Sequence, residues 1–186
     1  MATARRIVLL RGVNLASRNR IAMPELREQL RAAGFQQVNT YVQSGNVVLS
    51  SSASPRELAD EFRRVLVERF ELDVDVIVRT RDELAEVVAR DPLGEVALDP
   101  KRYQVSFLER ELDAEVVSRL SALATDDERF VAIGRELYAW HPHGVARSKL
   151  STRLADRGLG VAATARNWTT VCSLLALADH PPDEPA

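Results

Sequence analysis

Two polar loops in the first third of the sequence carry side chains suited to binding an anion. The first, R-G-V-N-L-A-S-R-N-R (Arg11–Arg20), contains three arginines and no acidic residue. The second is the Q-S-G-N turn at Gln43–Asn46, which lies between two runs of β-branched and aromatic residues. Guanidinium groups hold phosphate or carboxylate through paired hydrogen bonds, and amide or hydroxyl side chains orient the remainder of a ligand. We expect the two loops to form one site.

A further basic segment lies near the other end of the chain. Between Gly144 and Thr170, five basic residues stand against one acid, Asp156, although the whole chain has a net charge of −2. Positive charge is thus gathered into a few loops of an otherwise acidic protein. We predict that these loops meet in a basic cleft between two halves of the chain. The predicted ligand-binding residues are Arg11, Asn14, Asn19, Arg20, Gln43, Ser44, Asn46, Arg147, Lys149 and Arg166.

The elements that position these loops follow from hydrophobic periodicity. The first half is predicted to contain a strand at 6–10, a helix at 23–33, a hairpin at 37–51, a helix capped by Ser54, a strand at 73–78 and a helix at 83–90. The second is predicted to contain a strand at 102–108, a helix at 113–123, a hairpin at 129–141 turning at Gly134, a helix at 148–157, a strand at 161–165 and a helix at 168–178. Each half therefore reads β-α-β-β-α-β-α.

This order predicts an α+β fold of two ferredoxin-like halves, each with an antiparallel four-stranded sheet, related by internal pseudo-symmetry. We place the halves at residues 1–96 and 97–179, either side by side or exchanging elements, and expect a proline-rich disordered tail at 180–186. Trp168 follows Asn167, the expected cap of the last helix, so we expect its indole to be mostly buried and to serve packing.

Other chemistries find little support in the sequence. A single cysteine, Cys172, excludes an intramolecular disulfide, and its place on an apolar stripe favours a core role over a nucleophilic one. The H-P-H-G loop at 141–144 offers two imidazoles without a third ligand, so we expect no metal site. Nucleotide-binding and hydrolase fingerprints are absent, and we expect no cofactor. The apolar strand near the N-terminus is too short for a signal peptide's apolar region, and no run approaches the length of a membrane helix, so we expect a cytoplasmic protein without membrane contact.

Several segments together resemble a known family. These segments are L-L-R-G-V-N at 9–14, N-R-I-A-M-P-E-L at 19–26, G-F-Q-Q-V-N-T-Y-V-Q-S-G-N-V-V at 34–48, R-S-K-L at 147–150 and T-A-R-N-W-T-T-V at 164–171. The chain is similar to the bacterial domain of unknown function 1697 family. The resemblance implies a compact α+β fold of two similar, intertwined halves and assigns no activity. At Ala16-Ser17 family members often have a Gly-Gly pair, which is missing here.

The leading hypothesis is a protein that binds a phosphate-bearing small molecule or a nucleic acid end. One alternative is a cofactor-independent transferase or hydrolase that uses the same cleft, with Lys149 or Tyr41 transferring the proton; no catalytic residue is assigned. Another is a protein-interaction module in which the polar motifs are structural. For Ser44 the sequence favours a hydrogen-bonding or turn role over a catalytic one. The sequence does not specify the oligomeric state.

Overall fold

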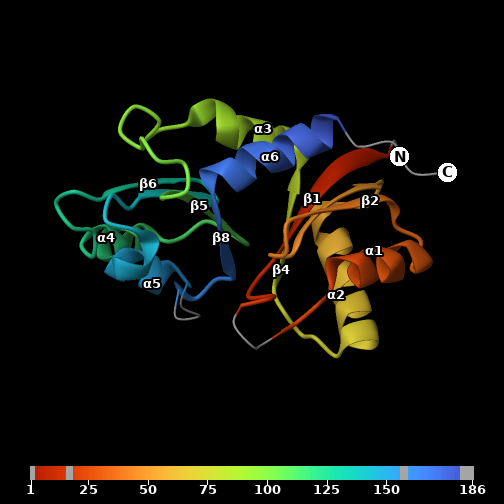
Figure 1. The fold of residues 1–186 in the computed structure, drawn as a ribbon. Helices are drawn as coiled ribbons and strands as arrows, with labels where there is room; N and C mark the ends of the chain where they lie inside the picture. Colours follow the sequence, from red (N-terminus) through yellow and green to blue (C-terminus); the bar gives the residue numbers. More distant parts are fainter. Residues whose placement is uncertain (1–2, 16–18, 156–158, 181–186) are drawn as a thin grey trace. The chain divides into compact units, whose positions relative to one another are not determined.

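The computed structural model describes residues 3–15, 19–155 and 159–180 (Figure 1). The first seven elements are β1 (Ala4–Leu10), α1 (Met23–Ala32), β2 (Gln36–Tyr41), β3 (Asn46–Ser51), α2 (Pro55–Phe70), β4 (Val76–Thr80) and α3 (Arg81–Arg90). They are followed by β5 (Tyr103–Leu108), α4 (Ala114–Ser121), β6 (Arg129–Ile133), β7 (Glu136–Trp140), a 3₁₀ turn at Val145–Arg147, α5 (Lys149–Ala155), β8 (Ala163–Asn167) and α6 (Trp168–Asp179). The predicted α+β class and the repeated β-α-β-β-α-β-α order are confirmed.

The strands form two four-stranded sheets with the same order. The first sheet runs β2-β3-β1-β4 and the second β6-β7-β5-β8, and every neighbouring pair is antiparallel. The first strand of each half therefore lies in the interior of its sheet, between the third and fourth strands. Consequently the loop that leaves β1 starts next to the turn that enters β3, and this adjacency sets the geometry of the predicted site.

One face of the first sheet packs on α1 and α2 (Figure 1). Leu26 and Leu30 place one stripe of α1 in this core, as the 3.6-residue period requires. Helix α2 begins with a capping box: Ser54 Oγ accepts from Glu57 N at 3.3 Å, and Ser54 N donates to the Glu57 carboxylate at 2.9 Å. Both features agree with the sequence pattern.

The second sheet packs one face on α4 and α5 (Figure 1). Leu120 of α4 and Leu150 and Leu154 of α5 are buried in this core. Helix α6 begins as predicted, because Asn167 Oδ1 caps it by accepting from Thr170 N at 2.8 Å. The Trp168 indole is half-buried and stacks on Tyr103, with ring centroids 4.7 Å apart.

The chain divides into two compact units, which differ in extent from the halves seen in the sequence. The first unit contains residues 1–86 and 173–186, and the second contains residues 87–172. Helix α3 therefore ends in the second unit, and α6 begins in the second unit and ends in the first. The expected halves, 1–96 and 97–179, follow the order of elements, whereas the units follow contacts between elements. Residues 181–186 of the expected tail lie outside the described part of the chain.

Two strands begin two or three residues later than predicted. Strand β4 starts at Val76 instead of Asp73, and its partner across the sheet is Leu10. The two aspartates of the D-V-D segment that precedes β4 form ion pairs, Asp73 with Arg63 and Asp75 with Arg11. Strand β8 covers Ala163–Asn167 instead of 161–165, and the predicted end of the helix at 148–157 lies outside the described residues.

No helix within the described residues is long and apolar enough to cross a membrane.

Candidate functional site

The two polar loops of the first unit contact each other directly, and Asn14 joins them. Asn14 Nδ2 donates to the carbonyl of Gln43 at 2.7 Å and to that of Ile21 at 2.9 Å, and Asn14 Oδ1 accepts from Ile21 N at 2.9 Å. One side chain thus closes its own loop and ties it to the hairpin turn. We call residues 11–15, 19–21 and 42–45 the loop pair.

Gly45 brings the hairpin turn against the end of β1. Its carbonyl accepts from Leu10 N at 2.8 Å, and its φ of +70° lies in the left-handed region. A Cβ atom at Gly45 would collide with Val13 Cγ2 and would lie 2.7 Å from Leu10 Cβ. The turn therefore requires glycine for both its backbone conformation and its close packing.

The other two asparagines of the predicted site also bond inward. Asn19 Nδ2 donates to the carbonyl of Gly12 at 3.1 Å, and Asn46 Nδ2 donates to that of Tyr41 at 3.2 Å. Asn46 is fully buried, although the sequence suggested a turn residue that a ligand could reach. These amides satisfy loop carbonyls that would otherwise lack partners, and they hold the loop pair in one conformation.

The outer rim of the loop pair contains strained backbone and exposed side chains. Val42 has a φ of +49°, which is unfavourable for a β-branched residue, and its side chain is 51% exposed. The Gln43 side chain beside it is exposed, and Ser44 is half-buried. Strained backbone persists only where the surroundings fix it, and it is frequent at functional sites.

The two described arginines of the first polar loop differ in their environments. Arg11 forms an ion pair with Asp75 (Nη1 to Oδ2, 3.1 Å), and its side chain is largely buried. Arg20 is exposed and has no hydrogen-bond or ion-pair partner among residues 3–15, 19–155 and 159–180. In this structure Arg20, rather than Arg11, presents an unpaired guanidinium group to solvent.

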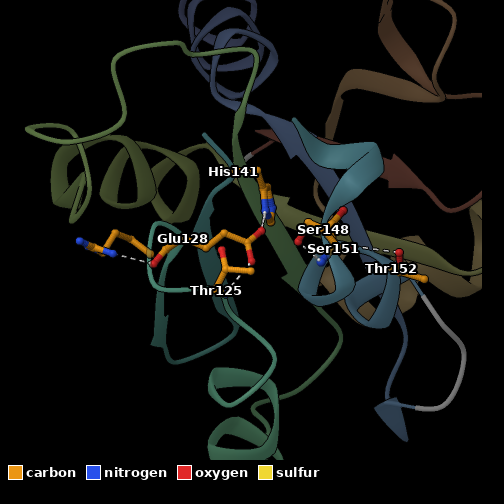
Figure 2. Close-up of polar contacts among 7 residues, drawn as sticks. Thr125, Glu128, His141, Ser148, Ser151 and Thr152 are labelled. Atoms are coloured by element: carbon orange, nitrogen blue, oxygen red, sulfur yellow. Dashed lines mark hydrogen bonds and ion pairs between the residues drawn. The ribbon is translucent and has the colours of Figure 1, made fainter. Parts of the chain in front are cut away.

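In the second unit, the R-S-K segment (Arg147, Ser148 and Lys149) is anchored by its middle residue (Figure 2). Ser148 is buried; its Oγ accepts from Ser151 N at 2.9 Å, and its hydroxyl donates to the Glu128 carboxylate. Arg147 and Lys149 flank it with exposed side chains, and neither has an ion-pair partner in the described part of the chain. One inward residue therefore leaves two cations facing solvent.

The buried hydrogen-bonded group that holds Ser148 in place also includes His141. Its Nδ1 lies 2.7 Å from Glu128 Oε1, and both side chains are almost completely buried. An ionised carboxylate only accepts, so Nδ1 carries the shared proton. Figure 2 shows the Glu128 carboxylate directed at the imidazole, while Thr125 N donates to the same carboxylate at 3.0 Å.

The surroundings of Glu128 act on its pKa in two directions. Burial raises the pKa of the carboxyl, but the hydrogen bonds from Ser148, His141 and the Thr125 backbone outweigh burial and hold the pKa below its usual value. Glu128 is therefore a carboxylate at neutral pH.

Glu128 and His141 are absent from the predicted site, although the sequence contained a signal for the pair. A two-residue turn at Gly134-Arg135 sets the register Ile133↔Glu136 and Arg129↔Trp140. Extending that register by one position places Glu128 opposite His141. The two imidazoles of the H-P-H-G loop thus go to different carboxylates, His141 to Glu128 and the exposed His143 to Asp127 at 3.0 Å.

Arg166 of β8 is buried and makes internal contacts. Its Nη1 donates to Thr164 Oγ1 at 2.7 Å and to the carbonyl of Ala165 at 2.8 Å. Burial lowers the pKa of Arg166 to about 10.

Cys172 is half-buried, and burial raises the pKa of its thiol, which disfavours the thiolate needed of a nucleophile. Among the described residues, no three His, Cys, Asp or Glu side chains group as metal ligands.

The comparisons with known proteins identify a family and a fold. Residues 3–138 match the family described as "Protein of unknown function (DUF1697)", so the R-S-K segment and β8 lie beyond the matched range. A solved structure, that of the conserved bacterial protein SP0830 from Streptococcus pneumoniae, has a TM-score of 0.76 and 20% sequence identity. The similarity covers 95% of this chain and 99% of that one, and at this identity it supports the fold alone. No curated protein matches the chain.

Proposed function

Because the chain belongs to the DUF1697 family, which is described as of unknown function, we propose a function from its side chains: it binds a phosphate-bearing ligand, a small molecule or a nucleic acid end. Three exposed cations that have no ion-pair partner in the described part of the chain carry this proposal, namely Arg20, Arg147 and Lys149. We further propose, on the sequence grounds given above, that binding takes place in the cytoplasm.

The arrangement of the R-S-K segment is the main support. Exposed arginines and lysines on a surface often pair with nearby carboxylates, and such pairs contribute little to stability. Here the buried Glu128 carboxylate binds Ser148 and His141, and among the described residues Arg147 and Lys149 have no acidic partner. A guanidinium group and an ammonium group on either side of one anchored residue suit the oxygens of a phosphate group.

The loop pair provides the second support, through Arg20 and the exposed Gln43 side chain. Asn14 fixes the backbone on which both residues stand, so ordering these loops on binding costs little conformational entropy. Arg11, Asn14, Asn19, Asn46 and Arg166 are assigned supporting roles, because their polar groups already have internal partners. Ser44 is half-buried and keeps the orienting role proposed from the sequence.

One observation favours a second candidate, a protein-interaction module. The inward amides of Asn14, Asn19 and Asn46 are structural, and the loop pair also exposes two apolar side chains, Leu15 and Val42. A partner protein would bury those side chains, whereas a small phosphate-bearing ligand would leave them in water.

A thermal-shift screen with nucleotides, 5′-phosphorylated oligonucleotides and phosphorylated metabolites tests the proposal. A ligand at about 100 times its dissociation constant stabilises the native protein by about 2.7 kcal/mol. Any ligand found is then titrated calorimetrically into the Lys149→Gln and Arg20→Gln proteins. The substitution in the basic segment that binds the ligand should weaken binding roughly tenfold or more, the loss expected for one charge-assisted hydrogen bond.

Arg56→Gln is the matched control, because Arg56 is also exposed and without a partner in the described residues, yet lies on α2 outside both basic segments. It should bind as the unaltered protein does. Equal weakening in all three variants would mean general charge attraction, and a panel without a stabilising ligand would favour the interaction module.

A further inference from the structure

At one edge of each sheet lies the first strand of its hairpin, β2 in the first sheet and β6 in the second. An edge strand is paired on one side only, so its other side presents backbone N–H and C=O groups that a further strand can bind. Proteins commonly prevent such pairing with bulges, charged side chains or prolines. The two edge strands of this chain differ in these features.

Strand β2 is irregular. Its pairing with β3 shifts register between Gln36 and Asn39, and Gln37 has a φ of +50°, in the left-handed region. Its sequence, Q-Q-V-N-T-Y, is mostly polar. A bulged, polar edge of this kind does not offer a regular ladder to a further strand.

Strand β6 is regular and apolar. It pairs with β7 without a register shift, and its residues 130–133, F-V-A-I, are all half-buried. Arg129 is the charged residue of the strand, but its guanidinium group bends back, and Nη1 donates to the carbonyls of Asp126 at 2.6 Å and Glu128 at 2.9 Å. The charge is thus held by the preceding turn, and the β6 edge favours pairing with a further strand.

The turn of this hairpin determines which of its residues bond to each other. A two-residue turn makes Ile133 and Glu136 a hydrogen-bonded pair, and such pairs recur at every second residue of an antiparallel ladder. The carbonyl of Arg135 instead accepts from Leu108 N at 2.9 Å, on the β5 side of β7, as this alternation requires. Every second residue of β6, counted back from Ile133, is therefore bonded to β7.

The two residues between them, Phe130 and Ala132, direct their N–H and C=O groups away from β7. In the part of the chain that the structure describes, these backbone groups have no hydrogen-bond partner. Two donors and two acceptors thus lie along one regular edge, with the spacing of a β-ladder.

A second copy of β6 fits these groups when it runs antiparallel about a twofold axis at Val131. Phe130 of each copy then lies opposite Ala132 of the other, and their outward groups form two hydrogen-bonded pairs. The large phenylalanine ring meets the small alanine methyl group on one face of the sheet. On the other face Val131 meets its own counterpart, and β-branched side chains in direct cross-strand contact stabilise a sheet.

The charges at the two ends of β6 also favour an antiparallel arrangement. The exposed Asp126 and Asp127 precede the strand, and Arg135 follows it. Antiparallel pairing brings the acidic end of one copy to the basic end of the other, whereas parallel pairing would bring acid to acid. The edge is therefore complementary to itself in backbone groups, side-chain size and charge.

From these observations we propose that two copies of the chain associate through β6, so that the second sheet continues from one copy into the other. The contact is short, about 17 Å for five residues at about 3.4 Å each, and lies at the small end of specific interfaces. The dimer is consequently weak and forms at high protein concentration. It rests on the β6 backbone and not on the exposed cations, so that failure of this proposal leaves the phosphate-binding function undecided, and the reverse.

The test combines sedimentation velocity, from micromolar to millimolar protein, with amide hydrogen exchange followed by NMR on the full-length chain. We expect a monomer–dimer equilibrium, and several-fold slower exchange of the Phe130 and Ala132 amides at the highest concentration. The amides of Val131 and Ile133 bond to β7 and should be protected at every concentration.

Two kinds of variant locate the contact. Ala132→Pro removes an outward N–H without removing a bond to β7, and proline is tolerated in edge strands, so the dimer should weaken tenfold or more while the fold persists. Val131→Lys and Val131→Glu each place like charges opposite one another across the twofold axis and should be monomeric. An equimolar mixture of the two should form heterodimers, which keeps the test decisive if the proline variant unfolds.

Gln36→Lys is the matched control, because it adds a charge to the exposed side chain of the other edge strand, β2, and should leave association unchanged. Three results would overturn the proposal. A chain that stays monomeric at millimolar concentration would leave the edge to an extended segment of another protein, and a dimer that persists in Ala132→Pro would place the contact elsewhere. A mixture of the Lys and Glu variants that stays monomeric would reject the twofold pairing at Val131.

Discussion

In the loop pair of the first unit and at its border with β3, Asn14, Asn19 and Asn46 all direct their amides at backbone carbonyls, whereas in the R-S-K segment of the second unit only Ser148 turns inward. In the first arrangement, internal contacts occupy most of the polar groups that were predicted from the sequence to bind a ligand. In the second arrangement, only the Ser148 hydroxyl makes internal contacts, and a guanidinium and an ammonium group are exposed.

The difference arises from how much backbone each region must bury. The loop pair packs two irregular segments against the end of a sheet, and their buried N–H and C=O groups need partners that regular structure does not supply. Asparagine, with donor and acceptor on a short side chain, fills this need. The R-S-K segment runs directly into α5, where Ser148 supplies partners for the first turn: its Oγ accepts from Ser151 N at 2.9 Å and its carbonyl accepts from Thr152 N at 3.1 Å.

The largest effect is expected from Gly45→Ala in the loop pair. The new methyl group would collide with Val13 and Leu10, and alanine would occupy a left-handed conformation. Overpacking and backbone strain together should lower the free energy of unfolding by about 4 kcal/mol, measured by urea denaturation.

Gly134→Ala supplies the control, because Gly134 also has a positive φ but nothing lies within 4 Å of the added atom. It should cost only the conformational penalty, about 1 kcal/mol. Similar losses in the two variants would show that close packing of the loop pair is not what requires Gly45.

A somewhat smaller loss is expected from Asn14→Ala, which removes two hydrogen bonds within the first loop and one to the hairpin turn. At about 1 kcal/mol for each bond, the free energy of unfolding should fall by about 3 kcal/mol. Gln43→Ala alters the exposed side chain next to the bonded carbonyl and should change stability by less than about 0.5 kcal/mol. If Asn14→Ala retained full stability but lost ligand binding, the asparagine would act on the ligand and the contrast between the two regions would fail.

Local signals in the sequence predicted much of this architecture. The Ser54 capping box, the Asn167 cap and the hairpin turning through Gly45 all depend on neighbouring residues, and all are present. The division of α3 and α6 between the two units was not predictable in this way. It depends on contacts between residues far apart in the chain, such as the Arg81–Asp179 ion pair, which periodicity does not encode.

The candidate site was predicted less well, for a physical reason. Residue type indicates what a side chain can bond to, but not whether its partner is a ligand or the protein's own backbone. Asn46 and Arg166 have suitable chemistry, yet both are buried. Hairpin register, by contrast, is readable from the turn, and it would have revealed the Glu128–His141 pair.

The smallest of the three stability effects is expected from Glu128→Gln, which keeps the shape of the anchor and removes its charge. Charge-assisted hydrogen bonds are about 1 kcal/mol stronger than neutral ones, and two side chains, Ser148 and His141, donate to this carboxylate. The substitution should therefore lower the free energy of unfolding by roughly 1–2 kcal/mol at pH 7. Lys149 should remain exposed. The affinity for a ligand should decrease only to the extent that the substitution displaces Ser148.

The pH dependence of this loss separates the anchor from simple packing. The pKa of Glu128 is lower in the folded protein than in the unfolded chain, so its charge stabilises the fold fully above the unfolded pKa of about 4.5. That stabilisation declines as pH falls from there through the folded pKa, because the native carboxylate becomes protonated. The difference between the Glu128→Gln and unaltered proteins should accordingly shrink in acid and be constant from about pH 6 to 8 for this group. A difference that stays the same down to pH 3 would mean that Glu128 contributes shape and not charge, and that the R-S-K segment is held by packing alone.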